Sequence, residues 1–209
     1  TLMRSSAALD VYKRQVLIPL IAAALIGLCK APARPTALLS ASLTLALGIW
    51  ALVSFDGCSS CWSRFEGMDL QLTLAPALSK VMLLLTILVT FATVLGTNPP
   101  QGGEASWYNS ALLISAGATG AFLSDNIISF FAFHELALIP TFVMIGLYGR
   151  GDRRTTAWRA TLYLGLASMV LLAALLMIGT QAGFTFSGLK DFMASGRELA
   201  HAELIGALL

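Results

Sequence analysis

The residue best placed to do chemistry in this sequence is Glu135. It lies in the long apolar segment 126–148, nine residues from its start, which is about 13 Å along a helix. A segment of this length can span a membrane, and a charge near the middle of a span costs about 2.5–3.5 kcal/mol on insertion scales. Such a carboxyl must face protein, water or a cation, or hold a proton, and is therefore a candidate for an ion or proton path. The plainer alternative is an acid that only hydrogen-bonds a neighbouring helix.

Four further residues could support chemistry at this acid. His134 points about 100° away from Glu135 around a helix and could relay protons near neutral pH or serve only in packing. Pro140 removes a hydrogen bond to the preceding turn, which frees a carbonyl near the acid or merely kinks the helix. Lys80 and Arg159 stand near the starts of other apolar segments. They could reach a buried acid, although anchoring at the membrane interface is the simpler role.

The composition places these residues in a membrane protein. Hydrophobic residues make up 57% of the 209 residues and charged residues 11%, whereas about 25% of the residues in soluble domains are charged. So few charges cannot cover a surface that faces water. The formal net charge of +2 also argues against a protein that binds nucleic acid. The sequence therefore predicts an integral membrane protein that contacts the lipid bilayer.

The apolar segments predict an all-α polytopic bundle of about six transmembrane helices and the start of a seventh. A span needs about 20 mostly apolar residues. The fourth segment contains a run of small residues, which predicts close packing between helices. The predicted spans are residues 16–29, 37–55, 70–96, 107–123, 126–148 and 157–179, with 204–209 as the start of the next.

The charges in the connections predict the orientation of the bundle. The first connection carries Lys30 and Arg34, and the fifth carries four arginines and one aspartate, a net charge of +3. Positive charge favours the cytoplasmic side, so the N-terminus of the first span is expected outside. Residues 1–15 carry three basic residues that contradict this orientation. We interpret them as a non-native or disordered leader, with a signal peptide as the alternative.

The cysteines predict no metal site. Cys58 and Cys61 form a C-x-x-C pair in the second connection, and Cys29 stands alone. A structural zinc ion usually takes four ligands, and no second pair or nearby histidine follows. On the outer side of a cytoplasmic membrane the pair could form a disulfide, and two free thiols are an equal alternative.

Several motifs together resemble one family. Residues 130–142 read FFAFHELALIPTF and residues 145–149 read IGLYG. This stretch resembles the fifth transmembrane helix of subunit M of bacterial NADH-quinone oxidoreductase (respiratory complex I), an antiporter-like, proton-translocating subunit. Residues 120–125 resemble the end of the fourth helix of that family, and residues 157–164 resemble the start of the sixth. The resemblance extends over about residues 16 to 209.

The resemblance implies a role for Glu135 as the family's proton-translocating glutamate. Its partner would be a lysine on the seventh helix, which would follow Leu209, so the chain looks like an N-terminal fragment. Quinone reduction elsewhere would change the charge state of this pair and so load and release protons. The chain departs from the family in the fourth helix, where many members carry a glutamate and this chain has Ser115 or a neighbour.

The resemblance also implies partners and a location. The partners would be other membrane subunits of complex I, in the inner (cytoplasmic) membrane of a bacterium. NADH, FMN, iron–sulfur clusters and quinone would be bound by those other subunits. This chain itself is expected to carry no redox centre, because it has no G-x-G-x-x-G motif and no cluster-type cysteine spacing.

Two other functions remain open at this point. The same glutamate-containing helix occurs in subunits of multisubunit sodium/proton antiporters and of membrane-bound hydrogenases, and neighbouring genes would separate these from complex I. The third hypothesis is a purely structural bundle that supports partner subunits. Replacement of Glu135 by glutamine would test that hypothesis, because a scaffold does not need the carboxyl.

Overall fold

The computed structural model describes residues 2–54, 63–65, 68–72, 77–99, 102–195 and 202–208. Two short antiparallel strands, β1 (Ser63–Phe65) and β2 (Met68–Leu72), form a hairpin in which Ser63 pairs with Leu72. The helices are α1 (Leu2–Leu28), α2 (Ala33–Ser54), α3 (Ala77–Gly96), α4 (Glu104–Leu123), α5 (Ile127–Tyr148), α6 (Arg153–Ala182), α7 (Phe186–Ala194) and α8 (Ala202–Leu208).

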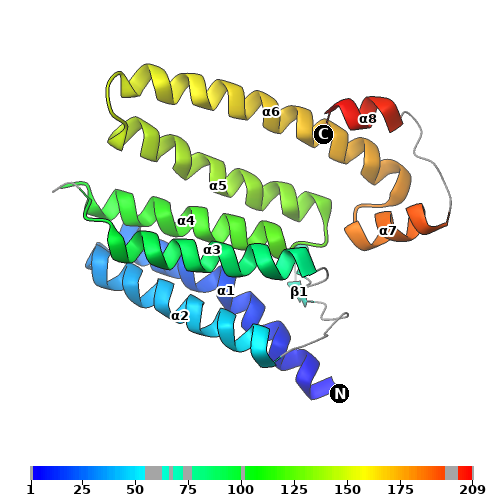
Figure 1. The fold of residues 1–209 in the computed structure, drawn as a ribbon, viewed down its shortest axis with the longest axis horizontal. Helices are drawn as coiled ribbons and strands as arrows, with labels where there is room; N and C mark the ends of the chain where they lie inside the picture. The colour runs from blue at the N-terminus through cyan, green and yellow to red at the C-terminus, as the bar shows by residue number, and fades with distance from the viewer. Residues whose placement is uncertain are drawn as a thin grey trace.

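The six long helices run in alternating directions along the length of the molecule (Figure 1). α4 packs against α1, α2, α3 and α5, whereas α6 packs against α5 and the short helices α7 and α8. α4 is therefore surrounded by long helices, whereas α5 is the only long helix that packs against α6 within the described residues. This arrangement confirms the predicted fold class, a polytopic bundle of α-helices, and adds one small hairpin to it.

α4 sits at the centre because its small residues let a neighbouring helix come close. A Cβ atom on Gly117 would lie 2.8 Å from the backbone nitrogen of Ala137 and 2.8 Å from the backbone oxygen of Phe133, both in α5. A Cβ atom on Gly120 would overlap the ring of Phe133. The run of small residues therefore serves packing, as predicted, and the close approach falls on the turn of α5 that carries Glu135.

Apolar side chains form two clusters at different places in the bundle. The first joins α1, α2, α3 and α4 and includes the fully buried Tyr108 and Leu112 of α4. The second joins the start of α5 to the later part of α6 and to α8, through Ile127, Ile178 and Ile205. Burial of a large apolar side chain contributes roughly 1.5–3 kcal/mol, so each cluster stabilises its own part of the bundle.

Hydrogen bonds fix both ends of α5. At its start, Asn126 caps the helix by accepting the N–H of Ile128 at 2.8 Å. The neighbouring carboxylate of Asp125, only 4% exposed, accepts the N–H and the hydroxyl of Ser187 at 3.1 and 2.8 Å. At the other end of α5, the hydroxyl of Tyr148 donates to the backbone oxygen of Gly103. The α4–α5 turn is thus tied to α7, and the end of α5 is tied to the start of α4.

Some element boundaries differ from the predicted ones. The segment predicted as a span over 70–96 contains α3, which begins at Ala77, and its residues 70–72 belong to β2. In the sequence Pro76 stands directly before this helix, and the start of a helix is the position that favours proline, because the missing N–H donor is not needed there. The connection after α6 contains α7, which is too short and polar to be found by a search for spans.

The first helix is also longer than the predicted span. α1 begins at Leu2, so the predicted span over 16–29 is the second half of a longer helix. The interpretation of residues 1–15 as a non-native leader stays a prediction. Cys58 and Cys61 lie outside the described residues.

Three helices in the described part of the chain are long and apolar enough to cross a membrane. They are α5, α6 and the Ser79–Gly96 part of α3. α4 carries buried hydroxyl groups on Ser110, Ser115 and Thr119, which a helix enclosed by other helices can accommodate. The predicted total of six spans stays a prediction.

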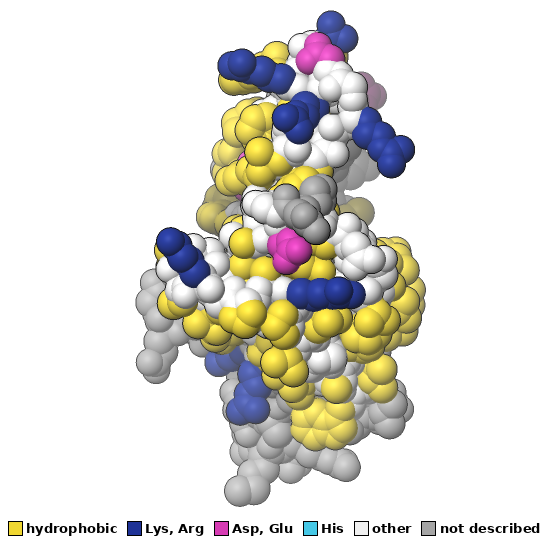
Figure 2. Space-filling model, turned by 90° about the vertical axis from the view of Figure 1, so that its left-hand side faces the viewer, with side chains coloured by type: hydrophobic (Ala, Val, Ile, Leu, Met, Phe, Trp, Pro, Cys, Tyr) yellow, Lys and Arg dark blue, Asp and Glu magenta, His cyan; other side chains and the backbone are white. Residues whose placement is uncertain are grey.

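Basic side chains gather at one end of the bundle, where α1 ends, α4 begins and α5 connects to α6 (Figure 2). This distribution matches the charge pattern from which the cytoplasmic side was predicted. The basic residues there are Lys30, Arg34, Arg150, Arg153 and Arg154, and the acidic residues are Glu104 and Asp152.

Asp152 starts α6 at this basic end. Its side chain accepts the backbone N–H of Thr155 at 3.3 Å, which satisfies one of the unpaired donors of the first turn. Hydrogen bonds from the side chain and the backbone of Thr155 hold the pKa of the Asp152 carboxyl below its ordinary value. The carboxyl therefore stays ionised at neutral pH, where its negative charge suits the N-terminus of a helix.

Gly117→Ala should destabilise the bundle, because the new Cβ would meet backbone atoms of α5 that cannot move alone. Overpacking of this kind costs about 1–3 kcal/mol. The matched control is Gly165→Ala in α6, where nothing lies within 4 Å of the added Cβ. The control should raise the free energy of unfolding by about 0.5–1 kcal/mol. Thermal unfolding in detergent measures both, and stabilisation by Gly117→Ala would contradict the close approach of α4 and α5.

Asp125→Ala should loosen α7, because it removes both acceptors of Ser187 and leaves a partly buried N–H without a partner. The loss is expected to be about 1–3 kcal/mol, which corresponds to amide hydrogen exchange at least about fivefold faster at residues 186–188. Asp191→Ala, at an exposed position of the same helix, is the control and should leave this exchange unchanged. Unaltered exchange in the Asp125 variant would show that the tie does not hold α7.

Candidate functional site

Glu135 lies on α5, eight residues after Ile127 and thirteen before Tyr148. These separations correspond to about 12 and 20 Å along the helix, so the carboxyl is well inside a span-length apolar segment. Its side chain is 33% exposed within the described bundle. The carboxyl is therefore partly open on the side that faces α6, and is less enclosed than the sequence suggested.

Ser168 of α6 is the direct partner of this carboxyl. The side chain is only 2% exposed, and its hydroxyl donates a hydrogen bond to Oε1 of Glu135. A hydrogen bond to a charged group contributes about 1.5–3 kcal/mol, and this one crosses between α5 and α6 beside side chains that are largely apolar. Ser168 therefore fixes the position of the carboxylate and provides it with a hydrogen-bond donor in a largely apolar interface.

A cavity of about 150 Å³ opens beside Glu135 between α5 and α6. Water occupies about 30 Å³ per molecule in the liquid, so the cavity has room for a few molecules. Its walls are largely apolar, with Glu135 and Thr161 as the polar residues. A carboxyl that borders such a space can exchange a proton with water. The other lining residues are Leu138, Ile139, Phe142, Ile145, Ala160, Leu164 and Gly165.

His134 lies close to the acid without bonding to it. The Nδ1 atom of His134 is 3.9 Å from Oε1 of Glu135, which is too long for a hydrogen bond. This nitrogen is buried and has no partner among the described residues. The ring stacks on Phe130 and Phe131, with centroid separations of 6.3 Å to each. The imidazole is thus held by aromatic packing within electrostatic range of the carboxyl.

The other three candidates differ in their relation to the site. Pro140 is buried in α5, and the helix continues past it to its end at Tyr148. Lys80 is in the first turn of α3, and Arg159 is an exposed residue of α6. Within the described part of the chain, neither forms an ion pair with Glu135. The structure therefore brings His134 and Ser168 to the acid, whereas support from Lys80 or Arg159 stays a prediction.

Ser168 was not found by sequence reasoning. The only signal was a single hydroxyl residue within the apolar run 164–178 of α6. Small polar residues are common in membrane helices and usually serve packing. The pairing becomes visible only when the register of α6 along α5 is known.

Comparisons with known proteins identify the class of protein that this fold and site define. The family described as NADH:quinone oxidoreductase/Mrp antiporter, transmembrane, matches residues 124–209, which include both Glu135 and Ser168. The resemblance recognised in the sequence is therefore confirmed. The chain is similar to the antiporter-like membrane subunits of respiratory complex I and related complexes.

Particular relatives support the same assignment. The F(420)H(2) dehydrogenase subunit M of Methanosarcina mazei is 25% identical over 174 residues, which cover 78% of this chain and 35% of the relative. The NADH-quinone oxidoreductase subunit M of Rickettsia typhi is 27% identical over 150 residues, 68% of this chain and 30% of the relative. The chain thus spans about a third of the length of these relatives.

A solved structure shows the same arrangement of helices. A chain of respiratory complex I from Thermus thermophilus with bound NADH superposes with a TM-score of 0.72 at 25% identity. The superposition covers 85% of this chain and 38% of that chain. The helices of this bundle therefore follow the path of a complex I membrane subunit.

Proposed function

We propose that this chain is part of a membrane subunit of NADH-quinone oxidoreductase that moves protons across a bacterial cytoplasmic membrane, with Glu135 as the group that carries the proton. One observation supports this above the others. An ionisable carboxyl lies deep in a span-length apolar helix, is held by Ser168 of the next helix, and borders a cavity large enough for water. Ionisable residues at such positions are rare and are typical of ion and proton paths.

The arrangement suggests how the proton is taken up and released. The carboxylate accepts the hydroxyl of Ser168, and a proton that arrives through water in the cavity neutralises it. A cation brought near the carboxyl favours the ionised form and so expels the proton, and its withdrawal allows the carboxyl to take up another. The resemblance assigns the role of this cation to a lysine on a later helix of the subunit. His134, held 3.9 Å from the carboxyl, is a second group through which the proton could pass.

The proposal assigns the redox chemistry to other subunits. NADH, FMN, the iron–sulfur clusters and quinone would be bound there, and other membrane subunits of the complex would be the partners of this chain. The basic end of the bundle would face the cytoplasm, which leaves the N-terminus of the first span outside. The oxidoreductase activity would then belong to the assembled complex, with this chain contributing translocation.

A second candidate function is favoured by the family match itself. The matching family includes Mrp antiporters as well as NADH:quinone oxidoreductases, so a subunit of a multisubunit sodium/proton antiporter or of a membrane-bound hydrogenase would carry the same helix. The genes beside this one separate the candidates: further complex I subunits support the first, and an antiporter or hydrogenase operon supports the second.

Glu135→Gln should abolish proton translocation while the complex still assembles. Glutamine keeps the size and the hydrogen bond of the side chain but cannot carry a proton, so pumping by vesicles that contain the assembled complex should fall about 100-fold or more. Acidification is followed with a pH-sensitive dye, and recovery of the variant chain in the purified complex reports assembly. Glu203→Gln, at an exposed position of α8, is the matched control. Unchanged pumping in the Glu135 variant would leave the structural scaffold as the better reading.

Ser168→Ala should slow translocation by at least about tenfold, because the carboxylate loses a charge-assisted hydrogen bond of about 1.5–3 kcal/mol. Ser168→Thr keeps the hydroxyl and should restore most of the rate. Rescue by threonine, together with normal recovery of the variant chains in the purified complex, distinguishes positioning of Glu135 from a packing defect. Equal loss in the alanine and threonine variants would assign Ser168 to packing alone.

A further inference from the structure

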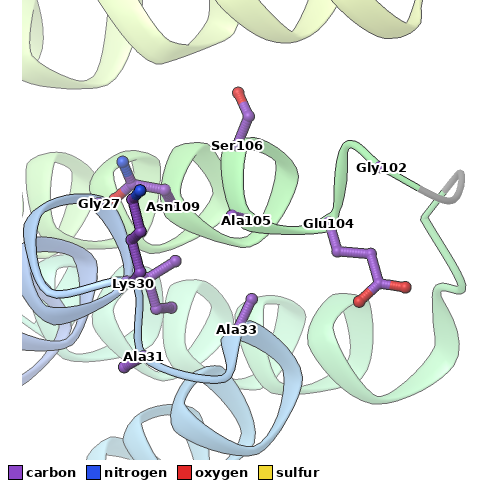
Figure 3. A pocket seen from close by; sticks show the side chains of 10 residues that line it. Gly27, Lys30, Ala31, Ala33, Gly102, Glu104, Ala105, Ser106 and Asn109 are labelled. Atoms are coloured by element: carbon purple, nitrogen blue, oxygen red, sulfur yellow. The ribbon is translucent and has the colours of Figure 1, made fainter.

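A second and larger cavity, of about 600 Å³, opens at the basic end of the bundle. It lies between the end of α1, the α1–α2 turn and the first turns of α4 (Figure 3). None of its lining residues belongs to the Glu135 site. Half of the lining residues are glycine or alanine, which leaves room near the backbone, and the polar side chains are Lys30, Glu104, Ser106 and Asn109.

Lys30 occupies a position that normally belongs to glycine. Its φ of 52° lies in the left-handed region, and every other described residue with a positive φ is a glycine. The N–H of Ala31 bonds to the oxygen of Leu25 at 3.2 Å, which closes α1 with the turn that usually carries glycine at this place. A lysine here is held in a conformation that L-residues rarely adopt. Strain of this kind is a reason to look for a function of the side chain.

The side chain of Lys30 shares one end of the cavity with Asn109 (Figure 3). Lys30 forms no ion pair with any described carboxylate. Among the described residues no donor reaches the buried Oδ1 atom of Asn109. This oxygen can only accept a hydrogen bond, so the group that Asn109 can offer to an anion is its Nδ2 amide. Figure 3 shows the carboxylate of Glu104 directed away from both residues. The cavity thus presents an unneutralised ammonium beside an amide.

The first turn of α4 adds donors to the same cavity. Gly103 precedes this helix and offers no side-chain cap, so the backbone N–H groups near Ala105 and Ser106 are available to a ligand. Such groups and the positive end of the helix favour an anion. Together with Lys30 and Asn109 they make a setting suited to a phosphate group.

The surroundings favour a phosphate that is part of a lipid. The cavity is at the end of the bundle where basic residues gather, which is expected to lie at the cytoplasmic surface of the membrane. On α1 a stripe of exposed apolar side chains leads towards Lys30 along the length of the helix: Leu17, Ile21, Leu25 and Leu28, the last 84% exposed. Acyl chains can lie along this stripe while the headgroup occupies the cavity.

We propose that the cavity lined by Lys30 and Asn109 binds the phosphate of an anionic phospholipid, whose acyl chains pack along α1. Lys30 supplies the charge, Asn109 and the start of α4 supply hydrogen bonds, and the small lining residues make room for the headgroup. The proposal is independent of Glu135 and of proton translocation.

Native mass spectrometry of the purified chain tests this by titration with phosphatidylglycerol, with phosphatidylcholine of the same acyl chains, and with inorganic phosphate. One basic residue near a membrane surface accounts for about fivefold in affinity for anionic lipid. The chain should therefore prefer phosphatidylglycerol by about that factor, and millimolar inorganic phosphate should not displace it. Lys30→Gly should remove the preference and at the same time raise the midpoint of thermal unfolding, because glycine suits the left-handed backbone.

The control is Arg34→Gln, which removes a basic residue at the same end but outside the cavity lining. It should keep the preference for phosphatidylglycerol. A Lys30→Gly chain that retains the full preference would overturn the proposal, as would an equal loss in the Arg34 variant, since that would indicate diffuse surface charge. Displacement of the lipid by inorganic phosphate would also overturn it, because the site would then take free phosphate.

Discussion

The close contact between the backbones of α4 and α5 at Gly117 is the interaction on which the rest of the site depends. Phe133 and Ala137 meet Gly117 on one side of α5. At 100° per residue, Glu135 lies opposite the midpoint of these two positions. Packing of α4 on this side therefore turns the carboxyl towards α6, where Ser168 receives it. A small residue in one helix thus decides which way an acid in the next helix points.

The interface between α5 and α6 is different in kind from that between α4 and α5. It includes a polar link, Ser168 to Glu135, and a cavity beside it, whereas α4 and α5 meet with almost no space between them. A carboxyl in an apolar setting needs a donor, and a group that exchanges protons needs access to water. Both the donor and the cavity lie on the α6 side of α5, because α4 packs closely against the opposite side.

Some of this could be predicted from the sequence because it depends on residues close together in the chain. The depth of Glu135, the neighbouring His134 and the run of small residues in α4 all follow from spacing along one helix. The hydrogen bond of Ser168 and the tie between Asp125 and Ser187 join residues 33 and 62 positions apart. Such pairs depend on how helices are registered against each other, and a hydropathy pattern carries no information on register. The hairpin was not predicted, because its strands are only three and five residues long and the second overlaps the start of the predicted span over 70–96.

The ties at the two ends of α5 have a mechanical consequence. Asp125 anchors the start of the helix to α7, and Tyr148 anchors its end to α4. Between them Gly117 holds its middle. α5 is therefore fixed to neighbouring elements at its start, middle and end. α6, in contrast, packs against α5 along one face only. A conformational change that separates Glu135 from Ser168 therefore requires less rearrangement if α6 moves than if α5 moves.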